Sequence, residues 1–232
     1  MAKNGSKENP LTSIIFNIAI PSLVLYKMSS PDRLGPLGGL LLAIAFPIFY
    51  GAYDYFTNRK HNLVSILGFV SIFLTGIFGL FKLEGIWFAV KEASVPSAIG
   101  LVLIGSMYTR NPLVRSLLYN EKIINIELVN RELELKNSKA QFEALLKTTT
   151  YLLTASFILS AVLNFALARI LLVSPAGTEA FNQELAKMTA LSYPVIAIPS
   201  MSVAAIALWK LLAGIKKLTG LELEAVFNPP KK

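Results

Sequence analysis

Long apolar stretches, separated by short polar connections, dominate the chain. Six of them are 18 residues or longer and carry few charges, which is the length a helix needs to cross the hydrocarbon core of a bilayer. They are Leu11–Met28, Leu34–Phe56, Leu63–Phe81, Ile86–Thr109, Thr150–Val173 and Met188–Ile215. The third stretch has no polar face, unlike a helix at the surface of a soluble domain. The pattern predicts an all-α polytopic membrane protein with six membrane-spanning helices.

One polar insertion, residues 111–148, separates the fourth stretch from the fifth. Asn111-Pro112 is typical of a helix start, and LVRSLL after it is typical of a short basic helix at a membrane surface. On either side of Asn137-Ser138 apolar residues recur at helical spacing: Ile126, Val129, Leu133, Phe142, Leu145 and Leu146. We expect a cytosolic helical hairpin that either packs under the bundle or serves as a docking platform for a membrane or cytosolic protein partner.

These patterns divide the chain into four regions. Residues 1–110 hold membrane helices one to four, 111–148 the cytosolic insertion, 149–215 membrane helices five and six, and 216–232 a cytosolic tail. Gly220 is expected to end a helix, with one further short helix after it. The connection SPAGTEAFNQELAKM before the last stretch is expected to form a short helix on the far surface.

Composition supports a membrane protein, and charge supplies its orientation. The 232 residues are 54% hydrophobic with a mean hydropathy of +0.57, and the net charge is +8. With the N-terminus inside, 16 of the 22 Lys and Arg residues fall on the cytoplasmic side and 4 on the other. This asymmetry predicts a multi-pass protein with both termini cytoplasmic. It also accounts for the positive charge without nucleic-acid binding.

The residue inventory offers little for catalysis. Cysteine is absent, which excludes disulfides and thiolate metal sites, and the single histidine, His61, is insufficient for a metal site. Ser-His-Asp, HExxH, phosphate-loop and paired-carboxylate motifs are missing. We therefore expect no enzymatic activity, cofactor or metal. The first ten residues lead into an apolar run without a small-residue cleavage site, so no cleaved signal peptide is expected.

A polar layer is predicted inside the membrane. Lys91 and Glu92 lie in the fourth stretch, where each charge costs roughly 2.5–3.5 kcal/mol near the helix centre. Under the predicted topology Asn164, Arg169 and Tyr193 share their depth in the outer half. Side chains of adjacent helical residues diverge by about 100°, so we expect Glu92 to meet Arg169, or Lys91 to meet Asn164. The layer is either a static ion pair or a site for a ligand, lipid or proton.

Three prolines are candidates for helix kinks: Pro21, Pro96 and Pro199. Asn17 and Glu92 each precede a Pro-Ser pair by four residues, in stretches one and four, as expected of inverted repeats in a transporter. Residues 196–200 repeat 18–22 as IAIPS without the polar residue, so apolar low complexity is the other explanation.

Several segments resemble bacterial inner-membrane proteins related to intracellular septation protein A, in particular a six-helix branch of that group. They are LGPLGGLLLAIAFPIFYGAYD (34–54), WFAVKEASVPSAIG (87–100), NPLVRSLL (111–118), LSAVLNFALA (159–168) and PAGTEAFNQELAKMTALSYPVIAIPSM (175–201). The resemblance implies a non-enzymatic envelope protein of the inner membrane that acts through protein or lipid partners. The alternative is a small secondary transporter that uses the polar layer as its site.

Overall fold

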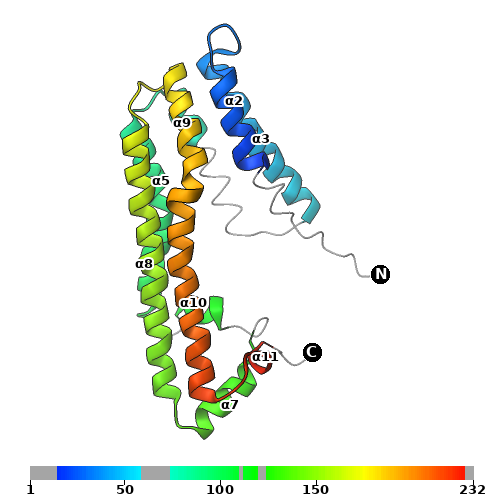
Figure 1. Ribbon diagram of the computed structural model, residues 1–232, viewed down its shortest axis with the longest axis vertical. Helices are drawn as coiled ribbons and strands as arrows, with labels where there is room; N and C mark the ends of the chain where they lie inside the picture. The colour runs from blue at the N-terminus through cyan, green and yellow to red at the C-terminus, as the bar shows by residue number, and fades with distance from the viewer. Residues whose placement is uncertain (1–14, 59–73, 110–111, 120–123, 228–232) are drawn as a thin grey trace. The chain divides into compact units, whose positions relative to one another are not determined.

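Every regular element that the structure describes is a helix. The computed structural model describes residues 15–58, 74–109, 112–119 and 124–227 (Figure 1). The elements are η1 (Ile15–Ala19), α2 (Ile20–Met28), α3 (Gly35–Asn58), α5 (Gly85–Ser106), α6 (Leu113–Leu118), α7 (Ile126–Leu135), α8 (Lys139–Leu171), α9 (Glu179–Ser192), η2 (Tyr193–Ala197), α10 (Ile198–Thr219) and α11 (Leu223–Val226), where η marks π-helical turns. The all-α prediction is confirmed.

Four helices in the described part are long and apolar enough to cross a membrane. They are Gly35–Ala52, Gly85–Ser106, Lys139–Leu171 and Glu179–Thr219. They correspond to the second, fourth, fifth and sixth predicted stretches. The first and third stretches, together with His61, lie wholly or partly outside the described residues, although Ile15–Met28 and residues 74–80 are helical.

Helix α8 runs without a break across the position where the cytosolic insertion was expected to give way to a membrane helix. It begins at Lys139, directly after the expected break at Asn137-Ser138, where Asn137 has a left-handed φ of 48°. Figure 1 shows α8 as one continuous ribbon. Thr148, Thr149 and Thr150 donate their hydroxyls to carbonyls four residues earlier. This polar run is therefore satisfied by its own helix, and nothing requires the helix to stop there.

The expected surface helix before the last stretch is wrong in its placement. Residues 179–192 instead form the first part of one long helical segment that continues through η2 into α10. Thr178 caps its start by accepting a hydrogen bond from the amide of Phe181 at 3.2 Å. Phe181, Leu185 and Met188 are buried, so this segment contributes to a core. Burial of that face explains why the segment does not lie on the surface.

The chain forms two compact units. The first comprises Met1–Val95 with Ala161–Ile196, and the second comprises Pro96–Ser160 with Ala197–Lys232. In the first unit α2, α3 and α9 contact one another. Its core has Phe88 at the centre, packed edge-on against Phe78 and Phe181. This aromatic cluster lies one helical turn from Lys91 along α5 and fixes that face of the helix.

The second unit packs the insertion against the last long helix. Val129 and Leu133 of α7 and Phe142 of α8 share one core with Leu211 and Ile215 of α10, which confirms the helical spacing predicted for the insertion. Gly220 ends α10 in a left-handed conformation (φ 72°), and α11 follows it, as predicted. Figure 1 draws α7 and α11 beside the end of α10.

Candidate functional site

Lys91 of the predicted polar layer lies on α5, in the first unit, and is buried. Its side chain is only 4% exposed. The ammonium Nζ lies 2.6 Å from Oε1 of Glu92 and donates to the hydroxyl of Thr75 at 2.5 Å. A buried charge of this kind needs both an opposite charge and hydrogen bonds, and Lys91 has both within the protein.

The expectation that Lys91 and Glu92 are poorly placed to pair is wrong. Their Cβ atoms do diverge along the helix, but each side chain has several rotatable bonds, so the two charged ends can curve back toward each other. The carboxylate of Glu92 is the more accessible partner, at 26% exposure. The basic group that the structure places at this carboxylate is Lys91, and Arg169 is exposed.

The remaining members of the predicted layer are less buried. Asn164 is half-buried in α8, and its pairing with Lys91 stays a prediction. Tyr193 is exposed and begins the π-helical turn η2. Thr75, which sequence reasoning missed, lies in the third apolar stretch, which also contains Ser65 and Ser71, so its hydroxyl gave no distinct signal.

Two of the three predicted prolines follow π-helical turns. Pro21 is the second residue of α2, directly after η1, and Pro199 is the second residue of α10, directly after η2. Proline has no amide hydrogen, so it cannot bond to the carbonyl four residues before it. A π turn has hydrogen bonds that span five residues, so the amide of the serine after each proline is in position to bond to that same carbonyl. The hydroxyls of Ser22 and Ser200 are buried without a hydrogen-bond partner. Both copies of the IAIPS repeat therefore share one local structure.

Pro96, the third predicted kink residue, is inside α5. It has no amide hydrogen, and the carbonyl it would have bonded belongs to Glu92. The hydroxyl of Ser94 donates to the backbone carbonyl of Lys91 at 2.6 Å. A side chain therefore supplies a hydrogen bond to the backbone next to the charged pair. The ion pair and the proline thus occupy the same turn of the helix.

A second polar group in the first unit was not anticipated. Asn182 of α9 is fully buried, and its Nδ2 donates to the hydroxyl of Ser29 at 2.9 Å and to the carbonyl of Pro36 at 2.6 Å. Gly39 approaches the same turn so closely that a Cβ there would lie 2.9 Å from Cα of Ser29. Asn182 therefore fastens the connection between α2 and α3 to α9. Its position within a polar run gave no signal that it would be buried.

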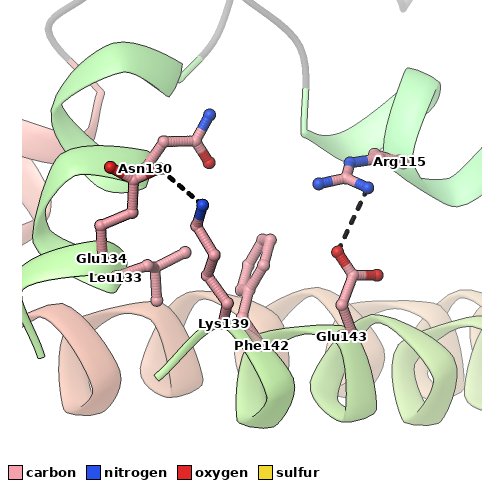
Figure 2. A pocket seen from close by; sticks show the side chains of 7 residues that line it. All are labelled: Arg115, Asn130, Leu133, Glu134, Lys139, Phe142 and Glu143. Atoms are coloured by element: carbon pink, nitrogen blue, oxygen red, sulfur yellow. Dashed lines mark hydrogen bonds and ion pairs between the residues drawn. The ribbon is translucent and has the colours of Figure 1, made fainter. Parts of the chain in front are cut away.

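The second unit carries a small pocket with charged walls. Its volume is about 200 Å³, and it is lined by Arg115, Asn130, Leu133, Glu134, Lys139, Phe142 and Glu143. Figure 2 shows the two ion pairs at its rim, Arg115 with Glu143 at 3.2 Å and Lys139 with Glu134 at 2.5 Å, on either side of Phe142. Exposed pairs of this kind are individually weak.

Tyr119 contacts two residues that line this pocket. Its hydroxyl donates to Oδ1 of Asn130 at 2.9 Å, and its ring lies 4.9 Å from that of Phe142 between centroids. Burial raises the pKa of the Tyr119 phenol to about 12, with a smaller opposing effect from Arg115. The phenol is therefore a fixed neutral donor at physiological pH.

Comparison with known proteins gives no relative for this chain: no family model, curated protein or solved structure matches it. Within the described residues, no group of three or more His, Cys, Asp or Glu side chains is arranged to hold a metal ion.

Proposed function

We propose that the chain is a non-enzymatic, multi-pass protein of the bacterial inner membrane that acts through protein or lipid partners. In this proposal six helices span the membrane, both termini and the insertion are cytoplasmic, and the protein serves the cell envelope as its resemblance to septation protein A-related proteins implies. The four long apolar helices support membrane residence. The 16-to-4 distribution of Lys and Arg supports the orientation.

The observation that carries a partner-binding role is the outward face of α7. Asn125 caps this helix, and Val129 and Leu133 point into the core of the second unit. The opposite face is left exposed, with Glu127 and Arg131 beside a well-exposed Leu135. A rigid helix that combines charges with an exposed large apolar side chain presents the mixture found at non-obligate protein interfaces.

A transporter is the second candidate, and one observation favours it. Lys91 is a buried charge in a helix of membrane-spanning length, and Pro96 interrupts the backbone hydrogen bonding of the same turn. Intramembrane charges at a broken helix commonly belong to substrate or proton pathways. The charge compensation of Lys91 by Glu92 and Thr75 supports the static interpretation instead.

The partner-binding proposal is tested by charge reversal on α7. Arg131→Glu changes an exposed side chain whose nearest acid is the adjacent Glu132 at 3.5 Å, so folding should be unaffected. Lys187→Glu on α9 is the matched control, because it reverses an exposed charge outside the insertion. Lys136 is avoided because its Nζ donates to the carbonyl of Thr219 at the end of α10.

Proteins cross-linked in the membrane to full-length chain are quantified for both variants at equal expression. We expect Arg131→Glu to lose the cross-linked partner and Lys187→Glu to keep it. Equal cross-linking in both variants would contradict docking on α7. A proton flux in vesicles that requires Lys91 and Glu92 would instead favour the transporter.

A further inference from the structure

Three exposed aromatic side chains lie at one level of the second unit. Ser138, the residue before α8, donates to the carbonyl of Leu218, and Gly214 of α10 packs against Leu145 of α8, so α8 and α10 run antiparallel. Continuing that register places Trp209 of α10 opposite the turn of α8 that holds Tyr151.

The end of α5 reaches the same level. Gly85 packs against Leu172, and Gly100 packs against Thr154 and Phe157, so α5 and α8 run antiparallel. Continuing that register places Ser106, the last residue of α5, near residue 150 of α8, and Tyr108 follows in the turn after it. The exposed fractions are 87% for Tyr108, 58% for Tyr151 and 71% for Trp209. Helices α8 and α10 and the turn after α5 therefore each expose an aromatic side chain within about one helical turn of the same depth.

The exposed surface changes character at this level. On one side it is apolar, with Leu101, Ile158 and Met201 exposed on α5, α8 and α10. On the other side it is charged, and the ion pairs of Lys139 and Lys216 lie there. Helix α8 continues for 20 residues past Tyr151 to Leu171, about 30 Å, which matches the hydrocarbon thickness of a bilayer. The aromatic level thus has the position of a membrane–water interface.

Two lysines sit at this boundary, on lipid-facing stripes. Lys147 precedes the exposed Tyr151 by four residues on α8, and Lys210 follows the exposed Ile206 by four residues on α10. Residues four apart lie on one face of a helix, so each cation continues an apolar stripe that would contact acyl chains. Long lysine side chains in this position extend their ammonium groups to the headgroup layer.

We propose that Lys147 and Lys210, flanked by Tyr108, Tyr151 and Trp209, bind the headgroup phosphates of anionic phospholipids. The aromatic rings hold the helices at the interface, and the two ammonium groups select lipids with a net negative headgroup. This inference rests on the proposed membrane residence and specifies the lipid partner. An attraction of this kind falls with ionic strength, because the charges are exposed.

Quenching of Trp209 fluorescence by brominated lipids tests this proposal. The chain has two tryptophans, so Trp87→Phe leaves Trp209 as the only reporter. The full-length variant is reconstituted in phosphatidylcholine containing equal small fractions of either dibrominated phosphatidylglycerol or dibrominated phosphatidylcholine. We expect the anionic lipid to quench more, with a local preference on the order of fivefold per lysine at low salt.

Lys147→Gln with Lys210→Gln, made in the same background, should remove that preference. Lys139→Gln with Lys217→Gln removes two exposed lysines that lie beyond the aromatic level, and it should retain the preference. Equal quenching by the two lipids without these substitutions would overturn the inference, as would a preference that survives loss of Lys147 and Lys210. Absence of quenching by either lipid would mean that α10 is not at the interface and would overturn the proposed membrane placement as well.

Discussion

The two units handle charge in opposite ways. In the first, Lys91 and Glu92 form an ion pair with side-chain exposures of 4% and 26%. In the second, Arg115 and Glu143 form one at 40% and 50%. The distances, 2.6 and 3.2 Å, differ little. Burial is therefore the variable that separates them, since a charge removed from water depends on its partner and an exposed charge does not.

The polar groups of the two units therefore differ in their roles. The buried Lys91 and Asn182 of the first unit have partners inside the protein, as in the contacts of Asn182 with Ser29 and Pro36. Two ion pairs of the second unit, Arg115–Glu143 and Lys139–Glu134, line a pocket and can exchange their partners for water or a ligand at little cost. Substitutions should accordingly affect folding in the first unit and surface properties in the second.

The largest effect is expected from Lys91→Ala. The substitution leaves Glu92 without the cation that compensates it and removes the donor to Thr75. Loss of one member of a buried pair typically costs about 3–5 kcal/mol. Thermal unfolding of the purified protein in detergent should show a strongly lowered midpoint, and expression in the membrane should fall.

The double substitution Lys91→Met with Glu92→Gln serves as the control. It removes both charges and approximately conserves volume, which is often neutral for a buried pair. A static role predicts a stable double variant that still binds its partners. A stable double variant without function would instead make the transporter interpretation the better one.

Asn182→Ala should have the next largest effect. It removes two donors and leaves the buried hydroxyl of Ser29 and the carbonyl of Pro36 without this partner, which typically costs about 1–3 kcal/mol. Gln183→Ala is the neighbouring control, because its Nε2 donates to Glu179 of the same helix, at 3.1 Å. The thermal unfolding midpoint of Asn182→Ala should therefore lie clearly below that of Gln183→Ala. Equal midpoints would show that the hydrogen bonds of Asn182 to the α2–α3 connection do not stabilise the fold.

Local patterns predicted the elements of both units better than the contacts between them. The spacing of Val129, Leu133 and Phe142 predicted the buried face of the insertion, because helical periodicity is a property of neighbouring residues. Gly220 marked the end of α10 because glycine readily adopts a positive φ. These inferences needed no knowledge of other helices.

The polar partners were harder to predict because they depend on other elements and on rotamers. The pairing of Lys91 with Glu92 requires both side chains to bend back, and Thr75 comes from a different stretch. The insertion was predicted to end at residue 148, yet the hydroxyls of the threonines at 148–150 each bond to their own helix. These hydrogen bonds allow α8 to continue through the polar residues, and a hydropathy pattern does not show them.

Tyr119 is a buried neutral group in the second unit, in contrast to the exposed ion pairs there. Its pKa is raised from 10.0 to about 12, so the folded state favours the protonated phenol. The resulting stabilisation is present below pH 10 and is lost as the pH rises from 10 to 12. Absorbance of the phenolate, measured as wild type minus Tyr119→Phe, should appear near pH 12. A difference signal near pH 10 would show that the ring is not buried.

Tyr119→Phe should also remove the hydrogen bond to Asn130 at neutral pH, at a cost of about 1 kcal/mol. The packing on Phe142 is retained in this variant. Asn130→Asp is an informative companion, because it places a carboxylate at the same acceptor position and should preserve the contact with the phenol.

The smallest effect is expected at the exposed pair. Arg115→Gln, Glu143→Gln and the combined variant form a double-mutant cycle, and the coupling energy should be about 0.2–1 kcal/mol. It should diminish further in 1 M salt, where the Debye length is about 3 Å. The unfolding midpoints of the four proteins at low and high salt measure it. A coupling near that of the Lys91 pair would mean that the pocket excludes water, and the contrast between the two units would then rest on geometry instead of burial.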